Sequence, residues 1–140
     1  NFKDALALAQ EKGYAEANPS LDINGIDTAH KIAILTRLAF NVEVNFKEIY
    51  CEGIARIKKG DIDFARELDY VIKLLAIVKK TSEGLEVRVQ PTFLPKDHIL
   101  SSVEDSYNAV YLTCDEVENM LFYGRGAGAR HAGPRGVARL

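Results

Sequence analysis

The order of helical and strand patterns along this 140-residue chain predicts an α+β fold, with helices packed on one face of a sheet. The first third carries an apolar repeat at helical spacing, formed by Ile32, Leu35 and Leu38. The second half holds short runs rich in β-branched and aromatic residues, which suit strands. Between two of these runs stands Ser82-Glu83-Gly84, which is typical of a hairpin turn.

The first part of the chain predicts two helices joined by an irregular segment. An amphipathic pattern covers residues 2–12, and the apolar repeat covers residues 26–40. Pro19 and Gly25 prevent one continuous helix between them. We therefore expect a loop-to-helix junction shortly before residue 26.

The remaining elements follow in order. We expect a short strand near residues 46–51, a helical turn near 53–58, and a helix capped by Asp61 that continues to about Leu68. Four strands are then expected, at residues 70–80, 85–93, 106–114 and 117–124.

Composition describes a soluble globular domain that is large enough to bury a core. Hydrophobic residues make up 47% of the chain and the formal charge is −2, a balance that does not favour nucleic acid or membrane surfaces as partners. No apolar run approaches the roughly 20 residues of a membrane span, and no signal peptide is visible. We therefore expect a cytoplasmic protein.

Cysteines and histidines give no sign of a disulfide or a metal site. Cys51 and Cys114 are isolated in sequence, and we expect both to be reduced core residues. His30, His98 and His131 are scattered, so no metal site is expected.

The segment that ends at Lys31 concentrates residues with chemical potential. Glu16, Asp22, Asp27 and Lys31 stand at steps of six, five and four residues. Residues four apart share a helix face, so Asp27 and Lys31 should project side by side. The carboxylates would then face a ligand amine and leave the lysine for proton transfer. The alternative, favoured on spacing alone, is a surface ion pair worth about 0.3–0.5 kcal/mol beside two solvated acids.

Several blocks of the chain, in order, resemble one known family. They are Gly13–Leu35, Glu52-Gly53-Ile54, Asp69–Ala76, Val89–Pro95, Asn108-Ala109-Val110 and Phe122–Gly128. The first block is similar to the catalytic-domain signature of homoserine dehydrogenase, and the similarity spans about residues 2–128. The resemblance implies a mixed, largely antiparallel sheet and the reversible NAD- or NADP-dependent oxidation of L-homoserine to L-aspartate 4-semialdehyde. This reaction belongs to threonine and methionine biosynthesis from aspartate.

The resemblance also implies roles for individual residues. Lys31 would donate and accept the proton, and Asp27 would contact substrate beside it. Glu16 would bind the homoserine ammonium close to the nicotinamide, and Asp22 would line the pocket. Since a nearby anion favours the charged amine, Lys31 is better supported as proton donor in aldehyde reduction than as base in the reverse direction.

Three further positions belong to the expected site. The resemblance implies that the backbones of Gly13 and Gly128 approach the cofactor, beside Glu16. Tyr14 either lines the substrate pocket or packs under the loop, and both readings stay open.

The expected domain organisation places residues 1–128 in the catalytic domain and residues 129–140 in an arginine-rich, poorly ordered tail. No Gly-x-Gly-x-x-Gly fingerprint follows a strand near the start, and the chain begins without methionine inside an amphipathic pattern. We therefore expect a fragment that lacks the nucleotide-binding domain, is inactive alone and forms a homodimer. Two alternatives remain open: a non-catalytic remnant that dimerises or binds an amino acid, and the substrate domain of another amino-acid dehydrogenase.

Overall fold

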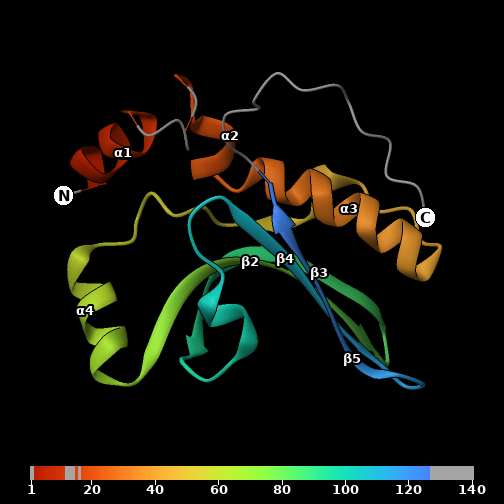
Figure 1. Ribbon diagram of the computed structural model, residues 1–140. Coiled ribbons are helices and arrows are strands. Elements are labelled where there is room, and N and C mark those ends of the chain that lie inside the picture. Colours follow the sequence, from red (N-terminus) through yellow and green to blue (C-terminus); the bar gives the residue numbers. More distant parts are fainter. Residues whose placement is uncertain (1, 12–14, 16, 127–140) are drawn as a thin grey trace, which may run out of the picture.

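The chain has an α+β fold in which helices dominate the first half and two antiparallel hairpins the second (Figure 1). The computed structural model describes residues 2–11, 15 and 17–126. The expected tail, residues 129–140, lies outside the described residues. The predicted fold class is confirmed.

The helical elements are α1 (Phe2–Glu11), α2 (Ser20–Ile23), α3 (Ile26–Phe40) and α4 (Lys59–Glu67), with 3₁₀ turns η1 (Phe46–Glu48) and η2 (Ile99–Ser102). The bounds of α3 are those predicted, and residues in the left-handed region stand at both ends. Gly25, with φ of 76°, precedes the helix, and Asn41, with φ of 53°, ends it while its N–H donates to the Arg37 carbonyl.

Three local predictions in the middle of the chain are wrong. Of the strand expected near residues 46–51, only Tyr50–Cys51 (β1) forms. The residues before it form η1 instead, because the Asn45 side chain accepts a hydrogen bond from the Lys47 N–H. Residues 53–58 contain a turn and no helix. Helix α4 begins at Lys59, so Asp61 lies inside its first turn and accepts the Lys58 N–H at 2.8 Å.

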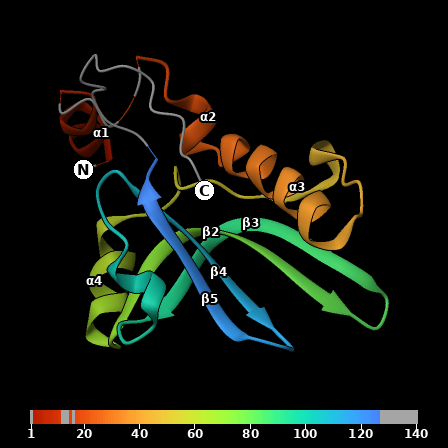
Figure 2. The ribbon, with the colours of Figure 1, turned by 45° about the vertical axis from the view of Figure 1, so that its right-hand side comes forward.

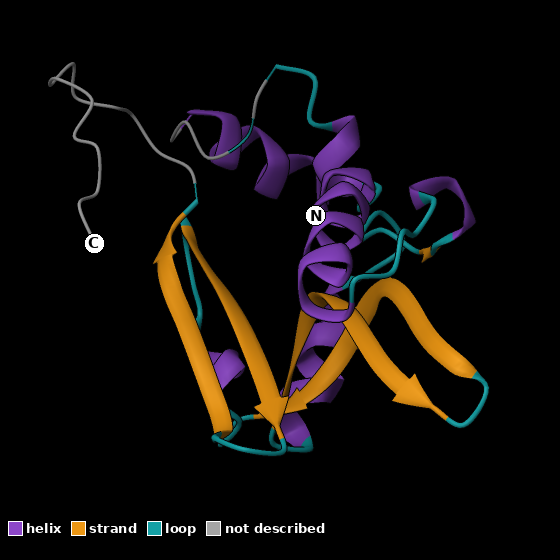
Figure 3. Cartoon of the chain, turned by 90° about the vertical axis from the view of Figure 1, so that its right-hand side faces the viewer, coloured by secondary structure: helices purple, strands orange, loops and turns teal. Residues whose placement is uncertain are grey.

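The strands form two sheets (Figure 3). In the first, β2 (Tyr70–Thr81) and β3 (Gly84–Pro95) pair antiparallel across a turn at Ser82-Glu83, and β1 pairs parallel with β3. In the second, β4 (Tyr107–Cys114) pairs antiparallel with β5 (Glu118–Arg125). The pairing is mixed and largely antiparallel, as the resemblance implied.

The core lies between α3 and one face of β2 and β3 (Figure 2). Ala29, Ile32, Ile49 and Val89 are its buried apolar residues. Alternate strand residues, including Leu74 and those two and four positions later, pack against them, as the period of two requires. Burial of this apolar face anchors α3 to the sheet.

The opposite face of β2 ties the two sheets together. Lys73, which follows Ile72 and precedes the core-facing Leu74, donates from Nζ to the Val103 carbonyl at 2.6 Å. Val103 ends η2 and leads into β4. A lysine of the first sheet therefore holds the connection that enters the second.

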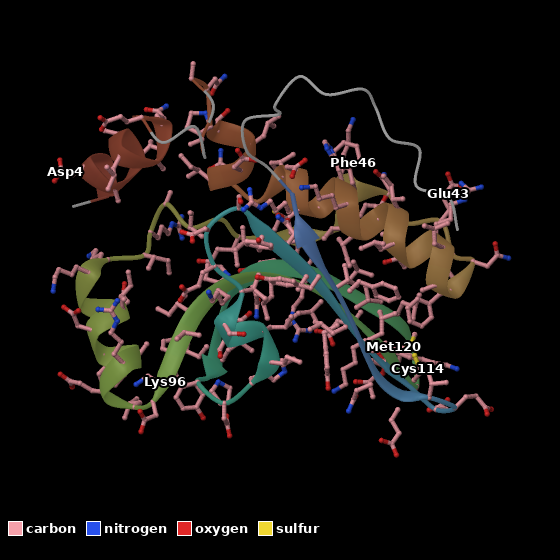
Figure 4. All side chains as sticks on the ribbon, viewed as in Figure 1. Asp4, Glu43, Phe46, Lys96, Cys114 and Met120 are labelled. Carbon is pink, nitrogen blue, oxygen red and sulfur yellow. The ribbon has the colours of Figure 1, made fainter. Side chains whose placement is uncertain are left out.

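The β4–β5 hairpin is more open than the helix–sheet core. Every residue of β5 is exposed, including the apolar run from Met120 to Tyr123. Figure 4 places Cys114 and Met120 together near the closed end of the hairpin. Cys114 and Cys51 are both free thiols and partly buried.

Candidate functional site

The candidate site is built where α2 meets α3. The turn at Asn24-Gly25 joins the two helices, and the left-handed conformation of Gly25 is one that residues with a side chain rarely adopt. Gly25 is itself buried against Cys51 and Val89, so this turn is seated on the sheet. Asp22 lies in α2 before the turn, and Asp27 lies in the first turn of α3 after it.

Asp27 and Lys31 form the ion pair that their spacing predicts. Asp27 Oδ2 lies 2.6 Å from Lys31 Nζ, on the side of α3 opposite the buried Ala29, Ile32 and Thr36. The two side chains are 41% and 62% exposed, respectively. An ion pair this open contributes at most about 1 kcal/mol to stability, so it is not needed to hold the helix.

Asp22 is an exposed acid close in sequence to this pair. Helix α2 contacts α3, and none of its residues is buried. Within the described part of the chain, the Asp22 carboxylate has no hydrogen-bonding or ionic partner. A free carboxylate in α2 and a cation–anion pair in the adjoining helix α3 are groups that can bind a small ligand carrying both an amine and a polar oxygen.

The other expected site residues are not placed. Gly13, Tyr14, Glu16 and Gly128 lie outside the described residues. Their predicted roles, together with those of Asp22, Asp27 and Lys31, stay predictions.

A second segment, residues 51–54, packs against the turn between α2 and α3 and supports the site. The sequence alone did not identify this segment as part of the site. The Ile54 N–H donates to the Ile23 carbonyl at 2.8 Å, and the Cys51 thiol donates to the Asn24 carbonyl at 3.3 Å. Gly53 lies against the same two residues, Ile23 and Asn24. The signal was present in Glu52-Gly53-Ile54, one of the blocks that carry the family resemblance.

The chemistry of Cys51 suits this supporting position. Burial raises the pKa of the Cys51 thiol above its ordinary value. The thiol therefore stays protonated at neutral pH and remains a hydrogen-bond donor to Asn24.

Neither a metal centre nor a membrane span is found in the described residues. Across residues 2–11, 15 and 17–126, no group of three or more His, Cys, Asp and Glu side chains is arranged to hold a metal ion. Helices in the same ranges are too short or too polar to cross a bilayer.

Comparison with known proteins identifies the family. A homoserine dehydrogenase family model matches residues 1–137. The chain is 48% identical over 128 residues to a homoserine dehydrogenase of Neisseria gonorrhoeae, covering 91% of this chain and 29% of that protein. It is 48% identical over 133 residues to a homoserine dehydrogenase of Synechocystis, covering 92% of this chain and 31% of that protein.

Solved structures show the same fold. A homoserine dehydrogenase of Thiobacillus denitrificans superposes with a TM-score of 0.88 at 44% identity, covering 91% of this chain and 30% of that one. A homoserine dehydrogenase of Staphylococcus aureus gives a TM-score of 0.87 at 38% identity, covering 91% and 32%. The chain spans less than a third of the length of these relatives. Since the match extends over nearly the whole chain in both sequence and fold, the chain belongs to the homoserine dehydrogenase family.

Proposed function

We propose that the full-length protein containing this chain interconverts L-homoserine and L-aspartate 4-semialdehyde with NAD or NADP. Family membership supports the reaction class. The observation that carries the proposal is the contact between Asp27 and Lys31 at the α2–α3 junction. It puts a proton donor beside a carboxylate inside the segment that resembles the family's catalytic signature.

The proposed roles follow from charge and position. In the reducing direction, Lys31 gives a proton to the aldehyde oxygen of the substrate as the carbonyl carbon receives a hydride. Asp27 holds the lysine and contacts the substrate. Asp22 and Glu16 bind the positively charged ammonium group of the amino acid, and Tyr14 lines the same pocket. The nicotinamide, when bound, supplies or accepts the hydride.

One backbone donor of the glycine-rich run after β5 is already engaged within the chain. Gly126, in the glycine-rich run after β5, donates its N–H to the Ser106 carbonyl at 2.8 Å. That N–H is therefore not free to bind a phosphate. We propose that most cofactor contacts come from another part of the full-length protein, with Gly13, Glu16 and Gly128 approaching the nicotinamide from this chain.

The exposure of Asp27 and Lys31 agrees with the proposal that another part of the full-length protein supplies most of the cofactor contacts. Asp27 and Lys31 lie open to water, where charge–charge interactions are weak. A second domain that closes over α3 would exclude water and strengthen the interaction of Lys31 with a developing alkoxide. The 140-residue chain alone should therefore not turn over homoserine.

We also propose a homodimer in the cytoplasm, with the second sheet at the contact. Met120, Leu121, Phe122 and Tyr123 follow one another along β5, so they present apolar groups on both faces of the hairpin. Exposed apolar groups of this extent mark interaction surfaces. A second copy of the same protein is the partner that we propose.

The reaction is tested with the full-length protein. We expect formation of reduced cofactor with L-homoserine and much slower formation with amino alcohols of other chain length. Equal turnover of several amino alcohols would favour another amino-acid dehydrogenase. Binding of homoserine, measured by calorimetry, without any turnover would favour the non-catalytic alternative.

A further inference from the structure

We propose that Gly53 is a positioning residue for the substrate pocket, and this inference rests on the proposed function. Because Gly53 has no side chain, the segment from Cys51 to Ile54 lies directly against Ile23 and Asn24. This contact sets the position of Asp22 relative to the pair formed by Asp27 and Lys31.

The approach at Gly53 is too close for any side chain. A Cβ atom there would lie 2.1 Å from the Ile23 carbonyl oxygen, 2.5 Å from the Asn24 Cα and 2.8 Å from the Asn24 carbonyl carbon. All three are backbone atoms, so no rotation of a side chain can relieve the overlap. Alanine at this position must displace either its own segment or the turn that joins α2 to α3.

The segment around Gly53 is itself fixed to the sheet. The Glu52 N–H donates to the Val89 carbonyl at 2.8 Å, and Cys51 pairs with Val89 in the β1–β3 ladder. On its other side, the segment bonds to the turn through the Ile54 N–H and the Cys51 thiol. A continuous set of contacts therefore runs from the fully buried Val89 to the turn beside Asp22.

Of the two helices at the turn, α2 is the one that can move. Helix α3 is anchored by Ala29, Ile32 and Thr36, which are all buried. Helix α2 has four residues and none of them is buried. Displacement at Asn24 should therefore shift Asp22 and leave the Asp27–Lys31 pair in place. The expected kinetic consequence is weaker substrate binding with an intact proton-transfer group.

The test uses Gly53→Ala in the full-length protein, with Gly60→Ala as the matched control. No atom lies within 4 Å of a Cβ built on Gly60, which is in α4 and outside the site. Misplacement of a binding group by about 1 Å costs up to roughly 100-fold. We therefore expect Gly53→Ala to raise KM for homoserine about 10- to 100-fold with kcat within about twofold of wild type. Gly60→Ala should leave both constants unchanged.

Measuring KM and kcat separately distinguishes a misplaced binding group from a simple loss of folded enzyme. Partial unfolding lowers the active fraction, which reduces apparent kcat at unchanged KM. That pattern in Gly53→Ala, or wild-type kinetics, would overturn the proposal.

A milder pair of variants keeps the proposal open to test if Gly53→Ala does not fold. Cys51→Ala removes the donor to the Asn24 carbonyl without steric overlap, and Cys51→Ser restores a donor. The loss of one hydrogen bond should raise KM about two- to tenfold in Cys51→Ala, with recovery in Cys51→Ser. Equal KM values in wild type and Cys51→Ala would overturn the proposal.

A structural readout separates failure of this inference from failure of the proposed function. If the wild-type protein does not oxidise homoserine, the proposed function is wrong. Crystal structures of wild type and Cys51→Ala then still decide the positioning role. Displacement of α2 relative to α3 in the variant supports it, and an unmoved Asp22 overturns it.

Discussion

The α2–α3 junction and the β4–β5 hairpin are supported in opposite ways. Beneath the junction, Ala29 and Val89 are 1% and 0% exposed, and backbone hydrogen bonds connect the turn to the sheet. On the hairpin, Phe122 and Tyr123 are 58% and 55% exposed. The candidate catalytic residues are therefore held by the chain's own core, whereas the apolar surface of the hairpin lacks cover within the described residues.

The difference indicates which parts of the proposed activity this chain can supply. A helix packed on a three-stranded sheet buries enough apolar surface to fix the positions of Asp27 and Lys31. A two-stranded hairpin is marginally stable by itself and gains from a partner surface. On the proposed function, the chain thus supplies an anchored helix that carries Asp27 and Lys31, and an exposed apolar surface for the proposed self-association.

The largest expected effect is the loss of activity on removing the proposed proton donor. In the full-length enzyme, Lys31→Met should lower kcat and kcat/KM together by about 10²–10⁴-fold, because proton transfer matters most in the transition state. Steady-state kinetics with homoserine measures this loss.

The chain offers a matched control for that variant. Lys59 forms an ion pair with Asp63 in α4, with the same spacing of four residues but outside the site. Lys59→Met should leave kcat unchanged and cost under about 1 kcal/mol of stability. Equal effects of Lys31→Met and Lys59→Met would mean that the Asp27–Lys31 pair is only a surface ion pair.

The second prediction concerns the core beneath the junction. Val89→Ala removes two methyl groups from a fully buried site and should destabilise the α3–sheet unit by about 2 kcal/mol. Hydrogen exchange of the α3 backbone amides in the full-length protein measures the free energy of local opening. Unchanged protection of α3 would show that its support does not come from β3.

The third prediction concerns the hairpin. Phe122→Ala should weaken self-association by about 1–2 kcal/mol, because the ring would lose a buried partner surface, and should leave α3 protection unchanged. Phe64→Ala, at a phenylalanine in α4 that is 57% exposed, is the control for loss of an exposed ring. Sedimentation at several concentrations measures the association constant. If both variants associate like wild type, the dimer contact is not on the hairpin.

The smallest expected effect is a shift in one pKa at the edge of the supporting segment. The Tyr50 hydroxyl donates to Glu52 Oε2 at 3.1 Å, and this hydrogen bond, with the nearby negative charge, raises the pKa of Tyr50. Since the folded value is the higher one, the contact stabilises the fold below the ordinary tyrosine pKa and is lost as pH rises through the folded value. Glu52→Gln should lower the pKa of Tyr50, as measured by NMR titration of its ring carbon. An unchanged value would show that the contact is absent in solution.

Sequence patterns predicted the individual helices and strands better than they predicted how these elements pack together. The bounds of α3 follow from its apolar repeat and from Gly25, and spacing alone put Asp27 beside Lys31. Short elements such as α2 and η1 depend on hydrogen bonds that involve one or two side chains or a single turn, which periodicity does not show. The division of the strands into two sheets depends on tertiary packing.

The supporting role of Gly53 illustrates the same limit. Gly53 lies in an irregular segment, and the sequence alone allows many structural reasons for a glycine in such a segment. Its close approach to Ile23 and Asn24 joins positions that are far apart in the chain, so only the folded structure reveals it.

The parallel pairing of β1 with β3 has a consequence for how the protein is made. During synthesis, Asp22, Asp27 and Lys31 leave the ribosome well before Val89, the residue to which their supporting segment is bonded. The site therefore cannot reach its final geometry until the β2–β3 hairpin has been translated and docked. Contacts of such long range slow folding. We expect the candidate site to reach its final geometry late, after the local helices have formed.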